Sequence, residues 1–290
     1  MKKAVRLLLI LAILFTASPA YARHPKVGLA LGGGGAKGAA TIGVLKVIEK
    51  AGIKIDYIAG TSIGAVIGGL YAAGYSAQEL ERLFLDQTWQ DILQGYKVED
   101  KLKSLLADRG VTSFSDTKRK TGIEFRCVAA EENSFDEEVL KSGSPLYKAI
   151  LASMSVPEIY EPVKWEEKSL VDGGVINNLP VDVVRNMGAD IIIAVDLQQA
   201  KEVSLGFSTK KLFGIDGLIN WLGTRRDLER YKKNLNSLRN NDVYIHPKLH
   251  KYNAASFGRK NCQRMSDFGR GAASRLWDKL LEIHDLQQGY

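Results

Sequence analysis

Cysteine and histidine are scarce in this chain, and each shortage excludes a class of site. Only two cysteines occur in 290 residues, so neither a disulfide framework nor a cysteine zinc site can be built. Cys127 lies in an apolar, strand-like run, which favours two separately buried thiols over a bridge between Cys127 and Cys262. The four histidines restrict the choice of a catalytic base. No cluster has metal-ligand spacing, so we expect neither a metal nor another cofactor.

A strong excess of one charge is also missing. The chain has 40 Lys and Arg against 33 Asp and Glu, a formal net charge of +7. Three of these basic residues lie in the first 22, and without them the net charge is +4. That excess favours an anionic lipid surface slightly and is far too weak to indicate nucleic-acid binding. The hydrophobic content of 45% is enough for one sizeable core.

Residues 1–22 have the pattern of a secretory signal peptide. The pattern consists of a basic start, an apolar run and a small-x-small cleavage sequence, at Lys2, Lys3 and Arg6, Leu7 to Ala17, and Ala20-Tyr21-Ala22. The apolar run is shorter than the roughly 20 residues that span a bilayer. An uncleaved anchor or a buried helix is the alternative. We expect cleavage near Ala22 and export, to the periplasm or out of the cell.

Strand-like and helical patterns alternate along most of the chain. Strands are predicted at Val27–Leu31, Ile53–Ala59, Ile123–Ala130, Lys168–Val171, Ile191–Val195 and, as an edge strand, Val243–His246. Helices are predicted at Ala39–Lys50, Ala65–Ala73, Ala77–Gln90, Pro145–Ser153, Pro180–Met187 and Gly269–Leu286. Glycine follows the first two strands. This order predicts an α/β fold with a mainly parallel central sheet sandwiched by helices.

The pattern weakens beyond Leu197, which suggests a division of the chain. We expect residues 23–200 to form the α/β domain and residues 201–290 a mostly helical C-terminal extension packed on it, with a loop at 201–209. The basic stretch from Leu212 to Arg230 is amphipathic and includes Trp221. It is typical either of a membrane-docking helix or of a surface helix packed on the core.

Gly60-Thr61-Ser62-Ile63-Gly64 matches the G-x-S-x-G turn that presents a nucleophilic serine. A predicted strand precedes it and a predicted helix follows, as that turn requires. The turn is too tight for side chains on its flanks, hence Gly60 and Gly64. We interpret Ser62 as the nucleophile of an acyl-ester hydrolase. The alternative is a glycine-bracketed turn in which Ser62 only caps the helix.

The glycine-rich run Gly32 to Gly38 admits three interpretations. A P-loop is excluded because Lys37 follows Ala36 and precedes Gly38. A dinucleotide fingerprint fits Gly33, Gly35 and Gly38, but its acid belongs at the exit of the second strand and Asp56 stands at the entrance.

The third interpretation is an oxyanion hole. Consecutive glycines at Gly33, Gly34 and Gly35 let backbone amides converge on a developing negative oxygen near a helix start. Lys37 either orients an anionic head group or is a solvated residue of the first helical turn.

A serine nucleophile also needs a base. The histidines are His24, His246, His250 and His284. A Ser-Asp-His order through His246 stays open. Asp172, at a strand exit before Gly173 and Gly174, is the stronger candidate, although an Asp-Gly turn explains it too. A carboxylate of ordinary pKa, about 3.9, is a poor base, so Asp172 must be desolvated or bonded directly to Ser62.

Three motifs together resemble the patatin-like phospholipase family. They are Gly33-Gly34-Gly35-Ala36-Lys37-Gly38, Gly60-Thr61-Ser62-Ile63-Gly64 and Asp172-Gly173-Gly174, in family order. The blocks at 152–157 and 177–182 are also similar, and the chain is identified as a bacterial member with a signal peptide. The resemblance implies a Ser62–Asp172 dyad without histidine, and an oxyanion hole at Gly33 to Gly35. Its implied substrate is a phospholipid or other acyl-ester lipid, with peripheral membrane contact.

Some features depart from the family or stay open. Thr41 stands where many bacterial members have histidine, and Glu158 where glycine is common. The stretch from Gln90 to Arg119 matches nothing in the resemblance and is a candidate lid. The acidic residues at 131–132 and 136–138 indicate a solvated face rather than a calcium site. A catalytically silent lipid-binding or scaffold protein of the same fold is the rival function.

Overall fold

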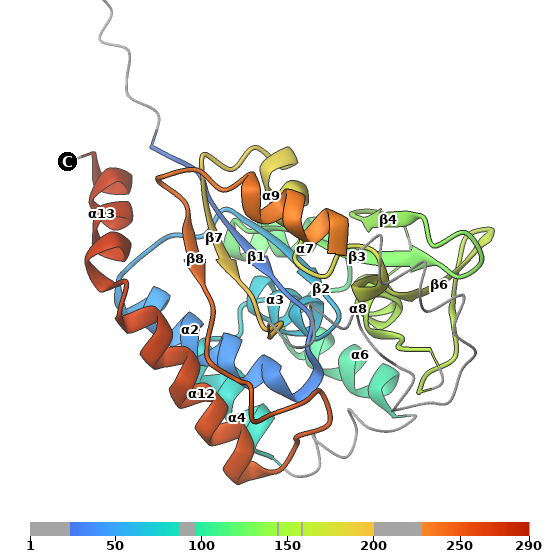
Figure 1. Cartoon of the computed structure of the whole chain (residues 1–290). Coiled ribbons are helices and arrows are strands. Elements are labelled where there is room, and N and C mark those ends of the chain that lie inside the picture. The colour runs from blue at the N-terminus through green and yellow to red at the C-terminus, as the bar shows by residue number, and fades with distance from the viewer. Residues whose placement is uncertain (1–23, 87–96, 144, 158, 200–227, 290) are drawn as a thin grey trace, which may run out of the picture.

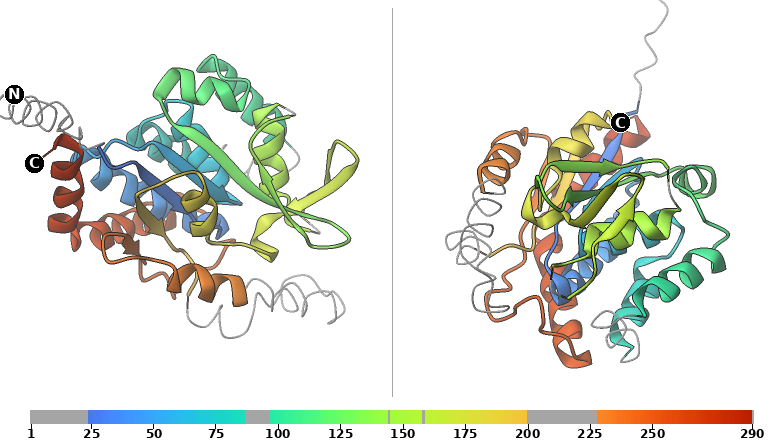
Figure 2. Two further views of the ribbon diagram at one scale, coloured as in Figure 1. Left: turned by 90° about the horizontal axis from the view of Figure 1, so that it is seen from above. Right: turned by 90° about the vertical axis from the view of Figure 1, so that its right-hand side faces the viewer.

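The structure is a computed structural model that describes residues 24–86, 97–143, 145–157, 159–199 and 228–289. The signal peptide, the loop at 201–209 and most of the basic amphipathic stretch lie outside these residues. At the centre is an eight-stranded sheet with helices on both faces (Figures 1 and 2). Among the described helices, none has both the length and the apolar character needed to cross a membrane.

The strands follow the order β5-β6-β3-β2-β1-β7-β8, and β4 pairs with β3. Their bounds are β1 Val27–Leu31, β2 Tyr57–Thr61, β3 Glu124–Glu131, β4 Glu137–Leu140, β5 Val163–Trp165, β6 Lys168–Asp172, β7 Ile191–Val195 and β8 Val243–Ile245. The run from β3 to β8 is parallel, whereas β4, β5 and β6 pair antiparallel. The predicted fold class and the edge strand at β8 are therefore confirmed, with an antiparallel section at one side.

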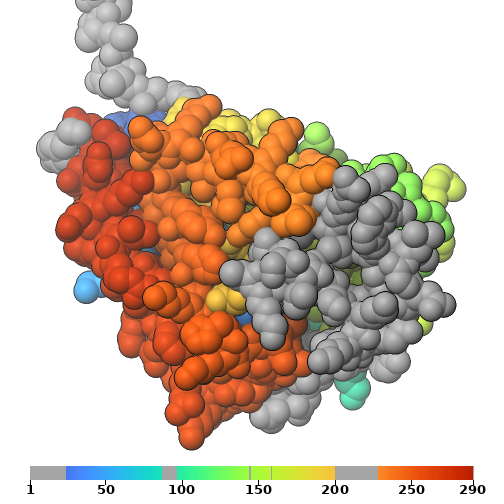
Figure 3. Space-filling model, in the orientation of Figure 1, coloured from blue at the N-terminus to red at the C-terminus, as the bar shows by residue number. Residues whose placement is uncertain are grey.

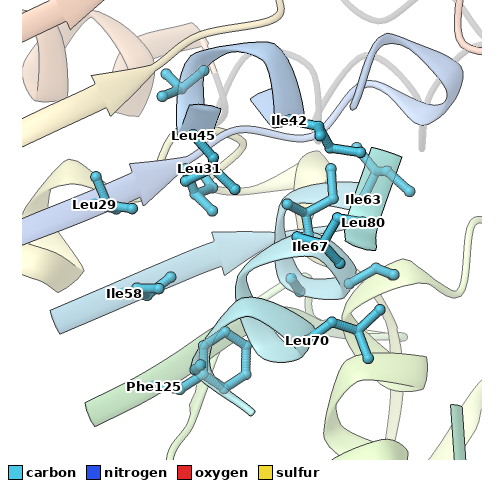
Figure 4. Close-up of a cluster of buried hydrophobic side chains, with 14 of the residues drawn as sticks. Leu29, Leu31, Ile42, Leu45, Ile58, Ile63, Ile67, Leu70, Leu80 and Phe125 are labelled. Carbon is cyan, nitrogen blue, oxygen red and sulfur yellow. The ribbon is translucent and has the colours of Figure 1, made fainter. Parts of the chain in front are cut away.

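Both central strands are apolar throughout because both faces of the sheet are covered. All five residues of β1 and of β7 are buried. In β1, Leu29 and Leu31 point into the larger core and Ala30 points to the opposite face. The larger core joins these leucines and Ile58 of β2 to the helices on the same face of the sheet, as Figure 4 shows for Ile42, Leu45, Ile63 and Ile67.

The described helices are α2 Gly38–Lys50, α3 Ile63–Ala72, α4 Ala77–Leu85, α6 Val98–Asp108, α7 Phe114–Thr121, α8 Leu146–Met154, α9 Val181–Asn186, α12 Arg259–Ser274 and α13 Trp277–Gln288. The larger core includes residues of α2, α3, α4, α6, α8 and α12. The other face is covered by α9 and by a helical stretch, 228–236, through Tyr231. Ser76 and Glu79 form the reciprocal capping bonds expected at the start of α4.

Several sequence-based boundaries are wrong. The predicted terminal helix Gly269–Leu286 is two helices, because the chain leaves helical geometry at Leu276 (φ −109°, ψ 20°). The first of them, α12, already begins at Arg259. The second strand begins at Tyr57, not Ile53, because Asp56 is held at the sheet edge by an ion pair with Lys26 and a bond from the Val27 amide.

Part of the candidate lid packs in the hydrophobic core. Helix α6 buries Leu102, Leu105 and Leu106 in the larger core, and Phe114 of α7 stacks near Phe125 of β3. Residues 97–119 therefore pack as core helices, and residues 87–96 lie outside the described residues. Both cysteines are free and buried, as expected, and burial raises the pKa of the Cys262 thiol to about 11.

The crossing of α2 and α12 depends on two glycines. A Cβ on Gly43 would lie 1.9 Å from the Ser266 carbonyl oxygen, and a Cβ on Gly269 would lie 1.9 Å from the Ala40 carbonyl oxygen. The two backbones are therefore in direct contact. This contact fixes α12 to the helix that follows the glycine-rich loop.

Gly269→Ala is expected to destabilise the protein by roughly 1–3 kcal/mol, because the methyl group overlaps the α2 backbone. Gly271→Ala is the matched control in the same helix. Its Cβ would have no neighbour closer than 3.9 Å, so it should stabilise by about 0.5–1 kcal/mol. Urea unfolding measures both, and equal stabilities for the two variants would contradict the close crossing.

Candidate active site

Ser62 stands at a strained turn between β2 and α3. Its backbone has φ 56° and ψ −126°, a conformation that costs a non-glycine residue about 1–3 kcal/mol. A Cβ on Gly60 would lie 2.4 Å from the Gly64 carbonyl oxygen, and a Cβ on Gly64 would lie 2.2 Å from that of Leu31. Only glycine fits on either side. The structure therefore has the tight strand-to-helix turn that the G-x-S-x-G pattern predicts.

The Ser62 hydroxyl donates a hydrogen bond directly to Asp172. The distance from Ser62 Oγ to Asp172 Oδ2 is 2.6 Å. Asp172 ends β6, which runs antiparallel to β3 and so returns this carboxylate to the edge where β2 ends. Its other oxygen, Oδ1, accepts the Gly174 amide at 2.7 Å. The two predicted residues, 110 positions apart in the chain, are thus in contact.

Burial changes the acid strength of this carboxylate. Asp172 is 5% exposed. Desolvation raises the pKa of Asp172 to about 6, and the bonds from Ser62 and Gly174 oppose that rise. A pKa near 6 leaves the group ionised at neutral pH yet far more basic than an exposed aspartate. The objection that an aspartate is too weak a base therefore does not apply here.

His246 lies in a different cluster. Its Nδ1 is 2.8 Å from the Tyr244 hydroxyl and its Nε2 is 3.2 Å from Gln199 Nε2. Tyr244 and Tyr231 both donate to the buried Asp196, at 2.6 and 2.7 Å. Strands β7 and β1 separate β8 from β2, a distance of about 14 Å across the sheet. The structure thus brings Asp172 to the serine and leaves His246 at the sheet edge.

The glycine-rich loop packs against the serine. A Cβ on Gly33 would lie 3.0 Å from Ser62 Cβ. The Gly33 amide donates to the Asn178 carbonyl oxygen at 3.2 Å, so this predicted oxyanion donor is already engaged. Among the described residues, the amides of Gly34 and Gly35 have no acceptor. They are the donors of the loop that an oxyanion can use.

Lys37 is buried, at 3% exposure, so its interpretation as a solvated first-turn residue is wrong. Its chain packs near Gly34, where a Cβ would lie 3.3 Å from Lys37 Cε. A role toward a lipid head group stays a prediction. The other motif glycines meet close backbone or side-chain contacts: a Cβ would lie 2.6 Å from Ile63 at Gly38, 2.2 Å from the Val128 carbonyl at Gly173 and 2.9 Å from Asp172 at Gly174.

Ser153 holds the G-x-S-x-G turn in place, a role that the sequence did not show. Its hydroxyl accepts the Ser62 amide at 3.0 Å and donates to the Val128 carbonyl oxygen at 2.6 Å. Ser153 is completely buried. The similarity of the block at 152–157 to the family pattern was the only available signal, and it indicated no contact. Ser153 thus joins the turn at Ser62 to β3.

Asn177 and Asn178 support the site from the other side. The Asn177 carbonyl accepts the Thr61 hydroxyl at 2.8 Å, next to Ser62. The Asn177 side chain donates to Glu137 at 2.6 Å and to Asp182 at 2.9 Å. It also accepts Asn234 Nδ2 at 3.0 Å.

Arg230 completes this network through ion pairs with Glu137 and Asp182. The expected solvated acidic face is therefore wrong for Glu137, which is half-buried and bonded. Among the described residues, no group of His, Cys, Asp or Glu could hold a metal ion. Of the departures from the family, Thr41 is buried in α2 and Glu158 lies outside the described residues.

The sequence of this chain is similar to those of known proteins. The model of the family described as patatin-like phospholipase matches residues 29–185, just over half of the chain. A patatin-like phospholipase domain-containing protein of Caenorhabditis elegans, ZK370.4, is 35% identical over 199 residues, 62% of this chain and 14% of that protein. The lysophospholipase nte1 of Aspergillus fumigatus is 35% identical over 187 residues, 59% of this chain and 12% of that protein.

The fold is also that of a solved structure. VipD from Legionella pneumophila superposes with a TM-score of 0.53 at 13% identity, over 88% of this chain and 67% of that one. The chain spans only about one-eighth to one-seventh of the length of the curated relatives it matches. The two relatives described above come from a nematode and a fungus, so membership of a bacterial, exported branch stays a prediction.

Proposed function

This chain belongs to the patatin-like phospholipase family, and from that premise we propose that it hydrolyses acyl esters of lipids with a Ser62–Asp172 dyad. The observation that carries the proposal is the 2.6 Å bond between the Ser62 hydroxyl and the buried Asp172 carboxylate. The strained backbone of Ser62 and the burial of the Asp172 carboxylate both fit this proposal. The strained serine is presented to solvent, and the desolvated carboxylate accepts its proton.

In the first step, Asp172 accepts the Ser62 proton while Oγ attacks the carbonyl carbon of the ester. The Gly34 and Gly35 amides and the N-terminus of α3 stabilise the tetrahedral oxyanion. The intermediate then collapses, and Asp172 returns the proton to the departing alkoxide oxygen. The products are an alcohol and an acyl ester on Ser62.

Water completes the cycle. Asp172 takes a proton from the water as its oxygen attacks the acyl-serine carbonyl, and returns that proton to Ser62 Oγ when the ester breaks. The fatty acid leaves and the free serine is restored. These steps use only Ser62, Asp172, the loop amides and one water molecule, which replaces the proton lost to the alcohol, so the proposal includes no cofactor.

The proposed substrate is a phospholipid, a lysophospholipid or a related acyl lipid. The family description and the fungal relative's printed name, lysophospholipase, support this class. Nucleic acid is not part of the proposal, since the charge excess is small.

The test incubates the protein with a fluorophosphonate probe and, separately, with phospholipid in detergent micelles. Probe labelling of Ser62, together with release of free fatty acid seen by mass spectrometry, is the expected result. A folded protein that stays unlabelled and releases no fatty acid would instead be the silent lipid-binding or scaffold protein. Thermal unfolding confirms that the sample is folded.

The pH profile reports the base. Because Asp172 must be ionised to accept a proton, kcat/KM should fall about tenfold per unit as the pH drops below about 6, and stay level above it. A soluble short-chain ester serves as substrate, so that lipid packing does not vary with pH. The inflection should persist in His246→Ala. An inflection near pH 4, or its loss in that variant, would contradict the assignment.

We further propose that the chain is exported. The support is the order of basic start, apolar run and Ala20-Tyr21-Ala22 in residues that lie outside the described ones. Expression of all 290 residues in a Gram-negative host should yield a periplasmic or secreted protein shortened by 22 residues, as measured by intact mass. A full-length chain in the cytoplasm would contradict export.

A further inference from the structure

The segment between β8 and the middle of α12 is basic and free of acid. Residues 247–266 contain five Lys or Arg residues and no Asp or Glu, and the acid that follows them, Asp267, is paired with Arg270. All five are exposed, namely Lys248, Lys251, Arg259, Lys260 and Arg264. Glu81 reaches this helix through Ser266 but is paired with Lys46. We call these five residues, with Tyr252 and Phe268, the basic face.

Helical spacing places cations and an aromatic ring on one side of α12. Lys260, Arg264 and Phe268 follow at i, i+4 and i+8 and therefore lie in one row. Phe268 is 46% exposed, which is high for so large an apolar side chain. The Tyr252 ring lies 6.3 Å from it, centroid to centroid, and joins the preceding loop to the same row. The opposite side of α12 packs on α2 through Gly269.

The basic face is joined to the oxyanion loop. The Ala254 carbonyl accepts the Ala36 amide at 2.8 Å, and a Cβ on Gly35 would lie 2.4 Å from the same oxygen. The loop that supplies the oxyanion donors therefore rests directly on the basic segment. In Figure 3 this segment, orange to red, forms the lower part of the outer surface.

From these features we propose that the basic face docks the protein on a bilayer containing anionic lipids and so brings the active site to its substrate. This inference rests on the proposed lipid hydrolase function. Each cation near an anionic surface adds to the attraction, and a partly exposed Phe and Tyr can enter the interface. The complementary charge and the exposed ring together favour a lipid surface over a nucleic-acid duplex, whose sequence-independent binding uses the cations alone.

Docking is measured without hydrolysis. Ser62→Ala protein is sedimented with vesicles of phosphatidylcholine alone, or of phosphatidylcholine with 30% phosphatidylglycerol, at low and high NaCl. We expect binding to the anionic vesicles that weakens with salt. Adding Lys260→Glu and Arg264→Glu should weaken this binding at least about tenfold, and Phe268→Ala should weaken it several-fold. Lys232→Glu with Lys233→Glu, an equal charge change at exposed positions on 228–236, is the control and should bind as before.

Several outcomes would overturn the proposal. Equal binding to neutral and anionic vesicles, no binding to either, or equal losses in the Lys260/Arg264 and Lys232/Lys233 pairs would each do so. Binding of a DNA duplex that depends on Lys260 and Arg264, without vesicle binding, would identify a nucleic-acid surface instead. Unchanged thermal unfolding shows that the variants fold. Probe labelling of wild-type protein decides the hydrolase function separately, so the two failures are distinguishable.

Discussion

Ser62→Ala is expected to lower kcat for acyl-ester hydrolysis by about 10⁴-fold or more, and to abolish fluorophosphonate labelling. The reason is that the proposed mechanism forms its covalent bond through Ser62 Oγ, and a bound water at that position lacks the fixed geometry of this oxygen. Fatty acid release from phospholipid, read by mass spectrometry against wild type, is the measurement. Ser115→Ala, an exposed serine on α7, is the matched control and should retain wild-type turnover.

Two substitutions at Ser62 distinguish its proposed catalytic role from the strain in its backbone. Alanine keeps the backbone cost of φ 56°, about 1–3 kcal/mol, whereas glycine adopts this conformation freely. Ser62→Gly should therefore be more stable than Ser62→Ala in urea, although glycine's entropic cost of about 0.5–1 kcal/mol reduces the difference. Both should be inactive. Residual turnover above about one per cent in both variants would show that another residue is the nucleophile.

Asp172→Asn is expected to lower kcat by about 10³-fold to 10⁴-fold and, at pH 7, to make the protein more stable. Turnover falls because the amide cannot accept the Ser62 proton. The fold is retained because the amide oxygen still accepts the Gly174 amide and the NH₂ group can donate to Ser62 Oγ. A matched Asp278→Asn exchange, exposed on α13, should leave both properties near those of wild type.

The stability change follows from the raised pKa. The folded state holds the Asp172 proton more tightly than the unfolded chain, so this carboxyl favours folding at low pH and loses that contribution as the pH rises through about 6. Asparagine does not ionise, so it should stabilise by about 1–3 kcal/mol at pH 7 and by almost nothing near pH 3. Urea unfolding at both pH values measures the difference. A destabilised Asp172→Asn at pH 7 would contradict a desolvated carboxylate.

His246→Ala tests the alternative mechanism, a Ser-His-Asp triad that uses His246. Because His246 bonds to Tyr244 and Gln199 and lies across two strands from Ser62, its loss should leave kcat within about threefold of wild type. A loss of 10³-fold in this variant, with normal folding, would restore a Ser-His-Asp mechanism.

Local patterns predicted the parts of the fold that depend on neighbours in the chain. The strands at β1 and β7 follow from unbroken apolar runs, and the turn at Ser62 follows from glycines that sterics demand on both sides. The break at Leu276 could not be predicted, because an amphipathic pattern continues across it and the change of direction depends on packing. The burial of Lys37 could not be predicted either, because tertiary contacts determine the exposure of a side chain.

Within the candidate site, residue types were easier to predict than contacts. The motifs predict Ser62 and Asp172. The hydrogen bond of the Gly33 amide depends instead on Asn178, 145 residues away in the chain. Ser153 likewise acts through a hydroxyl that bridges two backbone groups. Such long-range bonds leave no periodic pattern in a single sequence, so only the folded arrangement shows them.

The two adjacent carbonyls of Asn177 and Asn178 give the turn at Ser62 and the glycine-rich loop a common anchor. One holds Thr61, immediately before the serine, and the other holds Gly33. Each loop also has a second attachment of its own, the turn to Ser153 and the glycine-rich loop to Ala254. A substitution that shifts the backbone at 177–178 should therefore disturb both loops at once, whereas a change at either second attachment should disturb one loop alone.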